Sequence, residues 1–388
     1  MKVVTIVGAR PQFIKAATIS RAIKEFDRRS QIRRYRKKRI QEILVHTGQH
    51  YDTLMDKVFF EELKLPRPDY HLGVGSGSHA KQTGLMLERI ERVLEKEKPE
   101  TVIVYGDTNS TLAGALAAAK LKIPVGHVEA GLRSYNPGMP EEINRVLTDH
   151  LSTFLFCPTD QAARNLSKEG IKDGKTRVVK NVGDVMYDSI LFYSQMAEKR
   201  STILGDLGLF PAKTPNSEPE TPNYYLATLH RAENTDDPKK LKSILEALNE
   251  IGRNTPIVLP LHPRTKKMME VYHLSPGFKN IKFIEPLSYF DMLKLEKNAA
   301  GILTDSGGVQ KEAYWLSVPC FTLRGETEWV ETVRSRWNTL VGTEPKKIVR
   351  AVHHLEKKAL SKKSTGIFGN GKASEAIVGL LLKSPKLH

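Results

Sequence analysis

The sequence is poor in several features that would fix its class at once. Only two of its 388 residues are cysteine, Cys157 and Cys320, and both lie in apolar stretches. We therefore expect buried free thiols, as in the reducing cytoplasm, and no disulfide framework. No apolar run approaches the ~20 residues that span a bilayer. The N-terminus also lacks the long apolar region and cleavage site of a signal peptide, so a cytoplasmic protein without membrane association is predicted.

Two common nucleotide-binding loops are missing as well. No stretch matches G-x-x-x-x-G-K-[ST], which excludes a P-loop. No G-x-G-x-x-G follows the first predicted strand, which argues against a bound dinucleotide. The sequence therefore predicts no cofactor, and no metal site is expected.

Positive charge is in clear excess, with a formal net charge of +16. Much of it comes from one basic run, which consists of Arg28, Arg29, Arg33, Arg34, Arg36, Lys37, Lys38 and Arg39. Such a run could bind nucleic acid or another anionic surface. It contains one tyrosine and no RNA-binding signature, so a solvated helix end and loop is favoured. Nucleic-acid binding stays an alternative, and its mark would be an affinity that falls steeply with salt.

Short β-rich runs alternate with longer helical patterns in both halves of the chain, which predicts two doubly wound α/β domains with parallel sheets. The predicted strands are residues 3–8, 42–48, 101–107, 124–130 and 154–159, then 224–230, 256–262, 281–286, 301–306 and 319–324. We expect domains at residues 1–185 and 186–370, facing each other across a cleft, and a C-terminal helix within 371–388 that packs back on the first domain. A Pro-rich polar stretch at 211–222 is typical of a surface loop.

Two segments at strand ends carry cations suited to phosphate. The turn at residues 8–15 (GARPQFIK) follows a strand and opens a helix, where backbone N–H groups can meet an anion, and Arg10 adds a cation there. The segment HRAEN places His230 and Arg231 after another strand, and both can pair with a diphosphate. The alternative for each segment is a purely structural role.

A third strand-to-helix turn, DSGGVQKE at residues 305–312, is the main phosphate candidate. Ser306 can cap the following helix, and Gly307 and Gly308 let backbone donors approach a phosphate closely. The helix dipole adds partial positive charge, and Glu312 could accept hydrogen bonds from ribose hydroxyls. The alternative is a plain capped helix.

Three carboxylates indicate acid–base chemistry. Asp107 and Glu129 end two predicted strands joined by one helix, and Glu141 begins another helix. Neighbouring parallel strands end at the same edge of a sheet, so we expect these groups to converge as a proton-transfer site, although each alone could be a cap or a solvated acid. Arg133 and Arg145 are candidates to position or neutralise them, and Arg145 could equally be a surface charge.

These motifs resemble the non-hydrolysing UDP-N-acetylglucosamine 2-epimerase family. The resemblance covers essentially the whole chain, through GARPQFIK, TGQHYD, GDTNSTLAGALAA, HVEAGLRS, MPEEINR, LHRAEN, DSGGVQKEA and RGETEWVET. It implies a glycosyltransferase-B-like fold of two Rossmann-type domains, UDP held mainly by the second, and a homodimer. The opening residues and NVGDVMYDSI look more like the branch that acts on UDP-2,3-diacetamido-2,3-dideoxy-glucuronate.

The resemblance also implies roles by position. It makes Asp107, Glu129 and Glu141 the catalytic acids, and Arg10, His230, Ser306, Gly307, Gly308 and Glu312 the nucleotide contacts, with Lys15 and Gln49 as further cleft positions. We count His230 among the catalytic residues because it would stabilise the departing diphosphate. Arg133, Arg145 and Arg231 complete the predicted substrate contacts.

The position of the hydrogen at C2 of the sugar in the UDP-sugar limits the possible mechanism. This C2 is not next to a carbonyl group, so direct removal of its proton would leave an unstabilised carbanion. Without NAD, the remaining route is elimination of UDP to a glycal and its re-addition, with protons moved on both faces of C2. We assign Asp107 and Glu141 to proton transfer and Glu129 to support or to the second face. A hydrolysing epimerase with a similar site and a glycosyltransferase with a similar fold remain alternatives.

Overall fold

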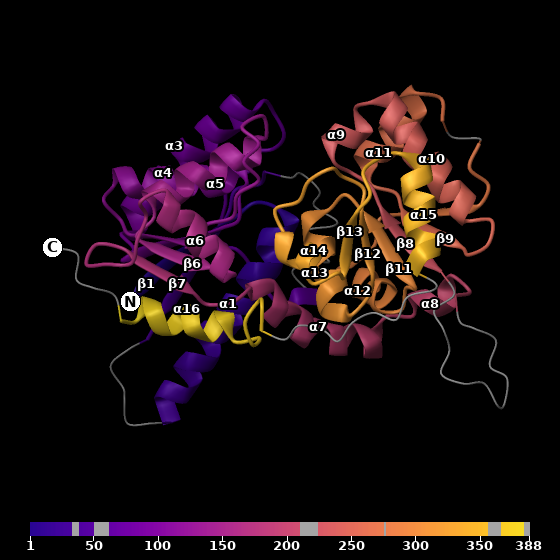
Figure 1. Ribbon diagram of the computed structural model, residues 1–388. Helices are drawn as coiled ribbons and strands as arrows, with labels where there is room; N and C mark the ends of the chain where they lie inside the picture. Colours follow the sequence, from indigo (N-terminus) through magenta and orange to yellow (C-terminus); the bar gives the residue numbers. More distant parts are fainter. Residues whose placement is uncertain (33–38, 50–61, 210–223, 275–276, 356–365, 384–388) are drawn as a thin grey trace. The chain divides into compact units, whose positions relative to one another are not determined.

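The computed structural model describes residues 1–32, 39–49, 62–209, 224–274, 277–355 and 366–383 (Figure 1). They divide into two units, the first made of Met1–Leu191 with Gly366–His388 and the second of Phe192–Thr365. The predicted surface loop at 211–222 lies outside the described residues.

In the first unit, seven strands of the described chain form one sheet in the order β3-β2-β1-β4-β5-β6-β7, and all its neighbouring pairs are parallel. The strands are β1 (Lys2–Val7), β2 (Gln41–His46), β3 (Tyr70–His71), β4 (Thr101–Tyr105), β5 (Val125–Val128), β6 (Phe154–Cys157) and β7 (Val178–Asn181). The strand order reverses between β1 and β4. In open parallel sheets, ligands bind beyond the carboxyl ends of the strands at such a point.

Helices cover both faces of this sheet: α3, α4 and α5 lie on one face, and α1 and α16 on the other (Figure 1). Their bounds are α1 (Arg10–Ile32), α3 (His79–Glu97), α4 (Asn109–Lys120), α5 (Pro140–Leu151), α6 (Asp160–Lys168), α7 (Val185–Arg200) and α16 (Ala373–Leu381). The N-termini are set by local sequence: Thr108 and Thr111 form a capping box before α4, and proline opens α5.

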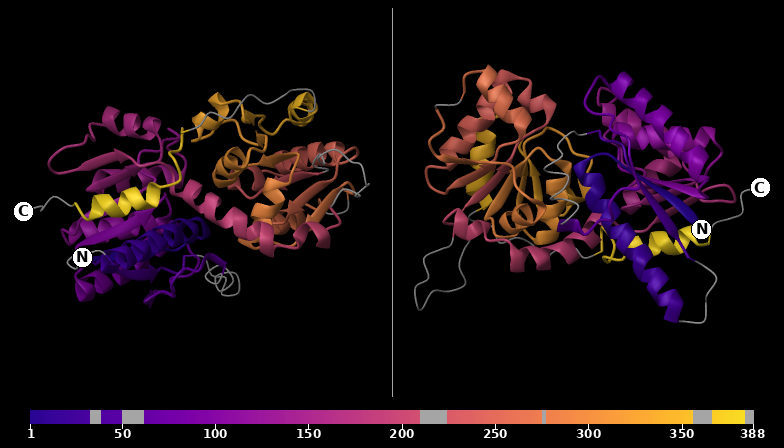
Figure 2. Two further views of the ribbon diagram at one scale, coloured as in Figure 1. Left: turned by 90° about the horizontal axis from the view of Figure 1, so that it is seen from below. Right: turned by 180° about the vertical axis from the view of Figure 1, so that it is seen from behind.

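The C-terminal helix α16 lies along α1 (Figure 2). The carboxylate of Asp188 caps it, accepting hydrogen bonds from the backbone N–H groups of Ala373 at 3.1 Å and Ser374 at 2.8 Å and from the Ser374 hydroxyl at 2.8 Å. A side chain of α7 thus fixes the start of a helix that is 185 residues away in the sequence.

In the second unit, six strands of the described chain form another parallel sheet, in the order β10-β9-β8-β11-β12-β13. The strands are β8 (Tyr225–Thr228), β9 (Ile257–Pro260), β10 (Ile281–Ile284), β11 (Gly301–Thr304), β12 (Cys320–Thr322) and β13 (Asn338–Leu340). The helices are α8 (Ile203–Asp206), α9 (Ala232–Thr235), α10 (Pro238–Ile251), α11 (Pro263–Val271), α12 (Tyr289–Lys297), α13 (Gly307–Leu316), α14 (Val330–Arg334) and α15 (Pro345–Leu355).

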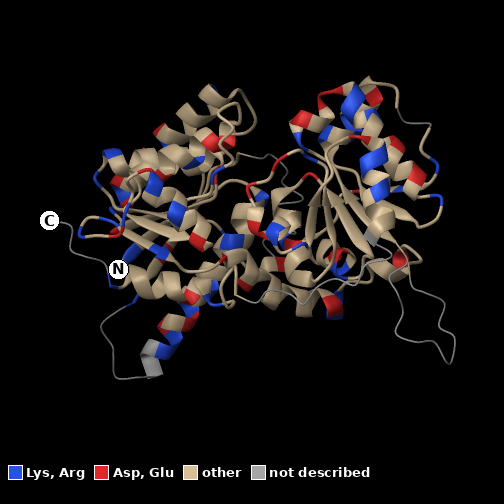
Figure 3. Ribbon diagram, in the orientation of Figure 1, with Lys and Arg blue, Asp and Glu red and all other residues tan. Residues whose placement is uncertain are grey.

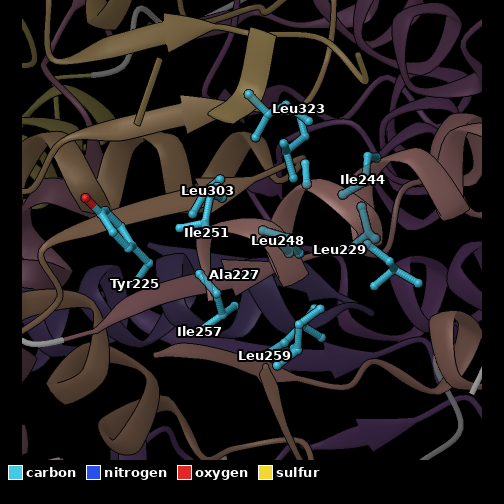
Figure 4. Close-up of a cluster of buried hydrophobic side chains, with 14 of the residues drawn as sticks. Tyr225, Ala227, Leu229, Ile244, Leu248, Ile251, Ile257, Leu259, Leu303 and Leu323 are labelled. Carbon is cyan, nitrogen blue, oxygen red and sulfur yellow. The ribbon is translucent and has the colours of Figure 1, made fainter. Parts of the chain in front are cut away.

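The core of the second unit shows why these segments fold as they do. Alternate residues of β8, such as Tyr225 and Ala227, point to one side, where Leu248 and Ile251 of α10 cover them (Figure 4). Helix α10 repeats apolar residues at helical spacing and buries that face. The two sheets confirm the predicted fold class, two doubly wound Rossmann-like α/β arrangements.

Charge on the described segments is spread over both units (Figure 3). The basic run predicted at residues 28–39 lies mostly outside the described residues. Within α1, Arg28 and Arg29 both pair with Glu25, at 2.9 and 2.8 Å, and hydrogen bonds from the two guanidinium groups lower the pKa of Glu25 to about 2. Among the described helices, none combines the length and apolar character needed to cross a membrane.

Candidate active site

Two predicted acids follow neighbouring strands of the first unit. Asp107 comes after β4 and Glu129 after β5, and these strands pair in register from Val102 with Val125 to Tyr105 with Val128. The structure therefore brings both residues to the same carboxyl edge, as the parallel pairing requires.

Glu129 sits in a strained turn. Its φ of 79° lies in the left-handed region that non-glycine residues seldom adopt. The backbone N–H groups of Glu129 and Ala130 both donate to the Phe156 carbonyl, each at 3.1 Å, which holds the turn. Strain of this kind is retained where the surrounding structure enforces it, often at functional sites.

The carboxylate of Glu129 forms an ion pair with Lys15 of α1, and both side chains are largely buried. Gly106, which has a φ of 63°, lies directly beneath this pair. A Cβ at that position would come within 3.3 Å of Lys15 Nζ and 3.4 Å of Glu129 Oε2. The glycine therefore leaves room for the predicted cleft residue Lys15 to reach the predicted acid.

Asp107 has its own cation, because Arg145 of α5 forms an ion pair with its carboxylate. Arg145 is buried and also donates to Glu142 at 2.7 Å. Glu142 in turn accepts hydrogen bonds from the backbone N–H groups of Ser134 and Tyr135, so it ties the preceding loop to α5. Of the two adjacent glutamates, Glu142 has this structural role, and Glu141 lies beside it in the first turn of the helix.

Arg133 is placed differently from Arg145. Its Nη1 donates to Asp149 at 2.7 Å and to the Leu132 carbonyl at 2.6 Å, and its Nε and Nη2 both donate to Glu169 at 2.7 Å. The guanidinium was predicted to contact substrate or to neutralise the acids. In the structure all three of its nitrogens donate to groups of the protein itself, and its side chain is 1% exposed.

The turn at residues 8–15 differs from the predicted anion site. Its first backbone N–H groups, those of Gly8 and Ala9, donate to the side-chain oxygen of Gln12 at 2.8 and 3.1 Å. Gln12 thus takes the donors that we expected to meet an anion, while Arg10 begins α1 beside them. Gln49 is also engaged by the protein, because its side-chain oxygen accepts from the hydroxyl of Ser110 at 2.7 Å.

In the second unit, Asp305 organises the segment that holds His230 and Arg231. Asp305 follows β11, is fully buried, and accepts hydrogen bonds from the backbone N–H groups of His230 at 3.1 Å and Arg231 at 3.0 Å. The side-chain amide of Asn234 donates to it at 3.3 Å. Asp305 is not among the site residues predicted from the sequence. Its position at a strand end, directly before Ser306, is the signal that could have identified it.

The N-terminus of α13 lies at the next turn. Ser306 is the N-cap residue, but its side chain makes no capping hydrogen bond, which corrects the expected role. Its backbone N–H donates to Thr304 Oγ1 at 2.9 Å. The Ser306 hydroxyl therefore does not compete with an anion for the first-turn donors. Glu312 is buried further along the same helix.

Charged groups, of which Arg324, Glu328 and Lys311 are buried, surround this helix start. Arg324 is fully buried and donates to Glu233 and Glu328, both at 3.2 Å, and Arg231 lies 3.9 Å from Glu328. Lys311 of α13 rests over the ring of Trp329, 3.8 Å from its centroid. These contacts fix the segment after β12 against α13.

Gly307 and Gly308 differ in the space that each leaves for a side chain, so alanine should have different effects on stability at the two positions. A Cβ on Gly307 would lie 2.3 Å from Glu328 Oε1, whereas a Cβ on Gly308 meets nothing nearer than the Ser306 hydroxyl at 3.8 Å. We expect Gly307→Ala to lower the stability of the protein by about 1–3 kcal/mol through overpacking. Gly308→Ala is the matched control and should melt like the wild type in thermal unfolding without nucleotide. Equal melting of both variants would contradict this account.

Each unit thus has polar side chains at the carboxyl ends of a doubly wound sheet, an acid cluster in the first and a helix N-terminus with arginines in the second. This combination is that of a glycosyltransferase-B-like, nucleotide-sugar enzyme. Residues 33–382 match the family model described as UDP-N-acetylglucosamine 2-epimerase. The chain belongs to the UDP-N-acetylglucosamine 2-epimerase family, as its motifs indicated, and epimerases are isomerases.

Similar proteins include two curated relatives and a solved structure. A UDP-N-acetylglucosamine 2-epimerase homolog of Methanococcus maripaludis is 52% identical over 385 residues, covering 98% of this chain and 99% of the relative. The UDP-2,3-diacetamido-2,3-dideoxy-D-glucuronate 2-epimerase of Pseudomonas aeruginosa is 48% identical over 384 residues, covering 99% and 100%. The crystal structure of Methanocaldococcus jannaschii UDP-GlcNAc 2-epimerase in complex with UDP-GlcNAc and UDP has a TM-score of 0.87 and 46% identity, covering 99% and 100%.

Proposed function

We propose that this protein interconverts UDP-GlcNAc and UDP-ManNAc without releasing the free sugar. The observation that carries the proposal is the pair of acids at neighbouring strand ends, each with its own buried cation: Asp107 with Arg145 and Glu129 with Lys15. The relative from Methanocaldococcus jannaschii, whose structure contains UDP-GlcNAc and UDP, supports the choice of substrate.

The proposed reaction is an elimination followed by re-addition. A carboxylate takes the C2 proton, the C2–H electron pair forms the C1–C2 double bond, and the C1–O bond breaks so that UDP leaves with the electron pair of the C1–O bond. UDP then adds back at C1 of the glycal, and a carboxylic acid delivers a proton to the opposite face of C2. Asp107 and Glu141 are the groups we assign to these transfers, with Glu129 as support or as the second-face acid.

Departure of UDP places new negative charge on its diphosphate. We assign its stabilisation to the N-terminus of α13, at Gly307 and Gly308, together with His230, Arg231 and Arg10. Donors that are already oriented toward developing charge lower a barrier without reorganisation. Asp305 supports this role, because it holds the backbone of His230 and Arg231 in place.

A second candidate substrate is UDP-2,3-diacetamido-2,3-dideoxy-glucuronate. The relative from Pseudomonas aeruginosa that bears this name matches the present chain over nearly its full length. The same elimination would operate, and the extra C6 carboxylate would require one more cation. Side-by-side assays of both UDP-sugars decide between the two substrates.

The mechanism predicts solvent exchange at C2. When UDP-GlcNAc is incubated with the protein in heavy water, the product should carry deuterium at C2, and small amounts of free UDP and glycal should accumulate. Mass spectrometry and NMR of the sugar measure both. Product without solvent deuterium would rule out elimination, and free ManNAc as the main product would show a hydrolysing epimerase instead.

We also propose a homodimer located in the cytoplasm. Ile143 and Leu147, one turn apart on α5, are exposed apolar side chains of the kind that a partner subunit covers. Both cysteines are free and buried, and burial raises the pKa of their thiols, which suits a reducing compartment. Light scattering at known concentration measures the mass of the assembly.

A further inference from the structure

A chain of buried charged groups runs beneath the two acid-bearing turns of the first unit. His127 of β5, Asp149 of α5 and Arg133 are all nearly or wholly excluded from solvent. Asp149 faces His127 Nδ1 at 2.7 Å through one oxygen and Arg133 at 2.7 Å through the other. Arg133 continues to Glu169, the residue that follows α6. Two basic and two acidic side chains therefore alternate along one network.

The ring of His127 has an acceptor at each nitrogen. Nδ1 faces the carboxylate of Asp149, and Nε2 lies 2.8 Å from the carbonyl oxygen of Gly106. A carbonyl oxygen can only accept, so Nε2 must carry a proton. Arg133 and the backbone N–H of Gly131 donate to the other oxygen of Asp149, at 2.7 and 3.1 Å, which favours the carboxylate anion and hence a proton on Nδ1 as well.

The charge of Asp149 agrees with this arrangement. Burial alone would raise its pKa, but the positive charges of His127 and Arg133 and their hydrogen bonds outweigh burial and leave the pKa lowered. A doubly protonated ring next to an ionised carboxylate also leaves the four-group network without net charge, which a buried site requires.

The network ends on the two turns that carry the proposed acids. Gly106, held through its carbonyl by His127, directly precedes Asp107. Gly131, held through its N–H by Asp149, lies two residues after Glu129 in the strained turn. The same network therefore holds the backbone of both turns.

We propose that His127 is a positioning residue for the reaction, a buried imidazolium that sets the placement of Asp107 and Glu129 through Gly106 and Asp149. The inference rests on the proposed epimerase function, since it assigns His127 a part in aligning the acids with C2 of the sugar. His127 itself does not touch substrate, so its effect should fall on kcat rather than on nucleotide binding.

The protonation state is tested by NMR of the protein labelled with 15N in its histidine rings. The chain has 12 histidines, and the signal lost in His127→Gln assigns the ring. Both ring nitrogens of His127 should carry protons, as the acceptors at Nδ1 and Nε2 require. A neutral His127 ring would overturn the inference, and this result does not depend on which substrate the enzyme uses.

The positioning role is tested with His127→Gln against His354→Gln, a matched change at an exposed histidine of α15. A misplacement of about 1 Å costs about 10²-fold in rate, so kcat of His127→Gln should fall by about that factor. The dissociation constant of UDP should stay as in the wild type. His354→Gln should match the wild type in both kcat and the dissociation constant of UDP.

Unchanged kcat in a folded His127→Gln protein would overturn the role. If this variant fails to fold, Asp149→Asn tests the same link. The substitution removes the carboxylate charge next to His127, while His127 Nε2 can still donate to the Gly106 carbonyl. Unchanged kcat in Asp149→Asn would also overturn the positioning role. Failure of the wild type to epimerise either UDP-sugar would instead contradict the proposed function. The NMR measurement does not depend on activity, so it distinguishes the two failures.

Discussion

Replacing Glu129 by glutamine is expected to lower kcat by about 10²- to 10⁴-fold, the range for loss of an acid–base group. The amide cannot exchange a proton with C2, yet it can still accept a hydrogen bond from Lys15, so the local packing should survive. UDP affinity should remain close to that of the wild type, because the proposed nucleotide contacts lie mainly in the second unit. Steady-state assays and calorimetric titration with UDP measure the two quantities.

The control for this variant is Glu95→Gln, which makes the same change at an exposed position of α3. It should leave kcat and UDP affinity unchanged. A Glu129→Gln protein that retains wild-type kcat would remove Glu129 from the reaction. A slow variant that still exchanges C2 deuterium into unepimerised substrate would identify Glu129 as the acid of the second face, a role that the sequence analysis left open.

Much of the fold could be predicted because its central strands are short apolar runs that alternate with helical patterns. The strands that the sequence analysis missed are β3, β7 and β13, and each lies at an edge of its sheet. Edge strands are short and partly exposed, so they lack the continuous apolar run that marks a buried parallel strand. Hydropathy therefore finds every central strand and one edge strand, β10, and misses the other three edge strands.

The site was predicted in part for the same reason. The placement of Asp107 and Glu129 follows from two neighbouring strands and one connecting helix, which is local information. The ion pair of Glu129 with Lys15 joins residues 114 apart in the sequence, and the capture of two backbone donors by Gln12 depends on the direction of one side chain. Neither leaves a pattern in hydropathy or spacing.

Asp305→Asn is expected to be the most damaging single change in the second unit. The carboxylate accepts hydrogen bonds from two backbone N–H groups and the amide of Asn234 at a position without solvent exposure. An asparagine side chain has one acceptor oxygen and would turn an NH2 group toward a donor. Each buried donor left unsatisfied costs about 1–3 kcal/mol, so the melting temperature should fall.

The same change should weaken UDP binding, because His230 and Arg231 lose the group that fixes their backbone. We expect the dissociation constant of UDP to rise at least about tenfold, equivalent to about 1.4 kcal/mol. Asp237→Asn is the matched control: Asp237 caps α10, where asparagine caps equally well, so neither melting nor UDP affinity should change. If Asp305→Asn melts lower but binds UDP normally, the segment of His230 and Arg231 is not part of the nucleotide site.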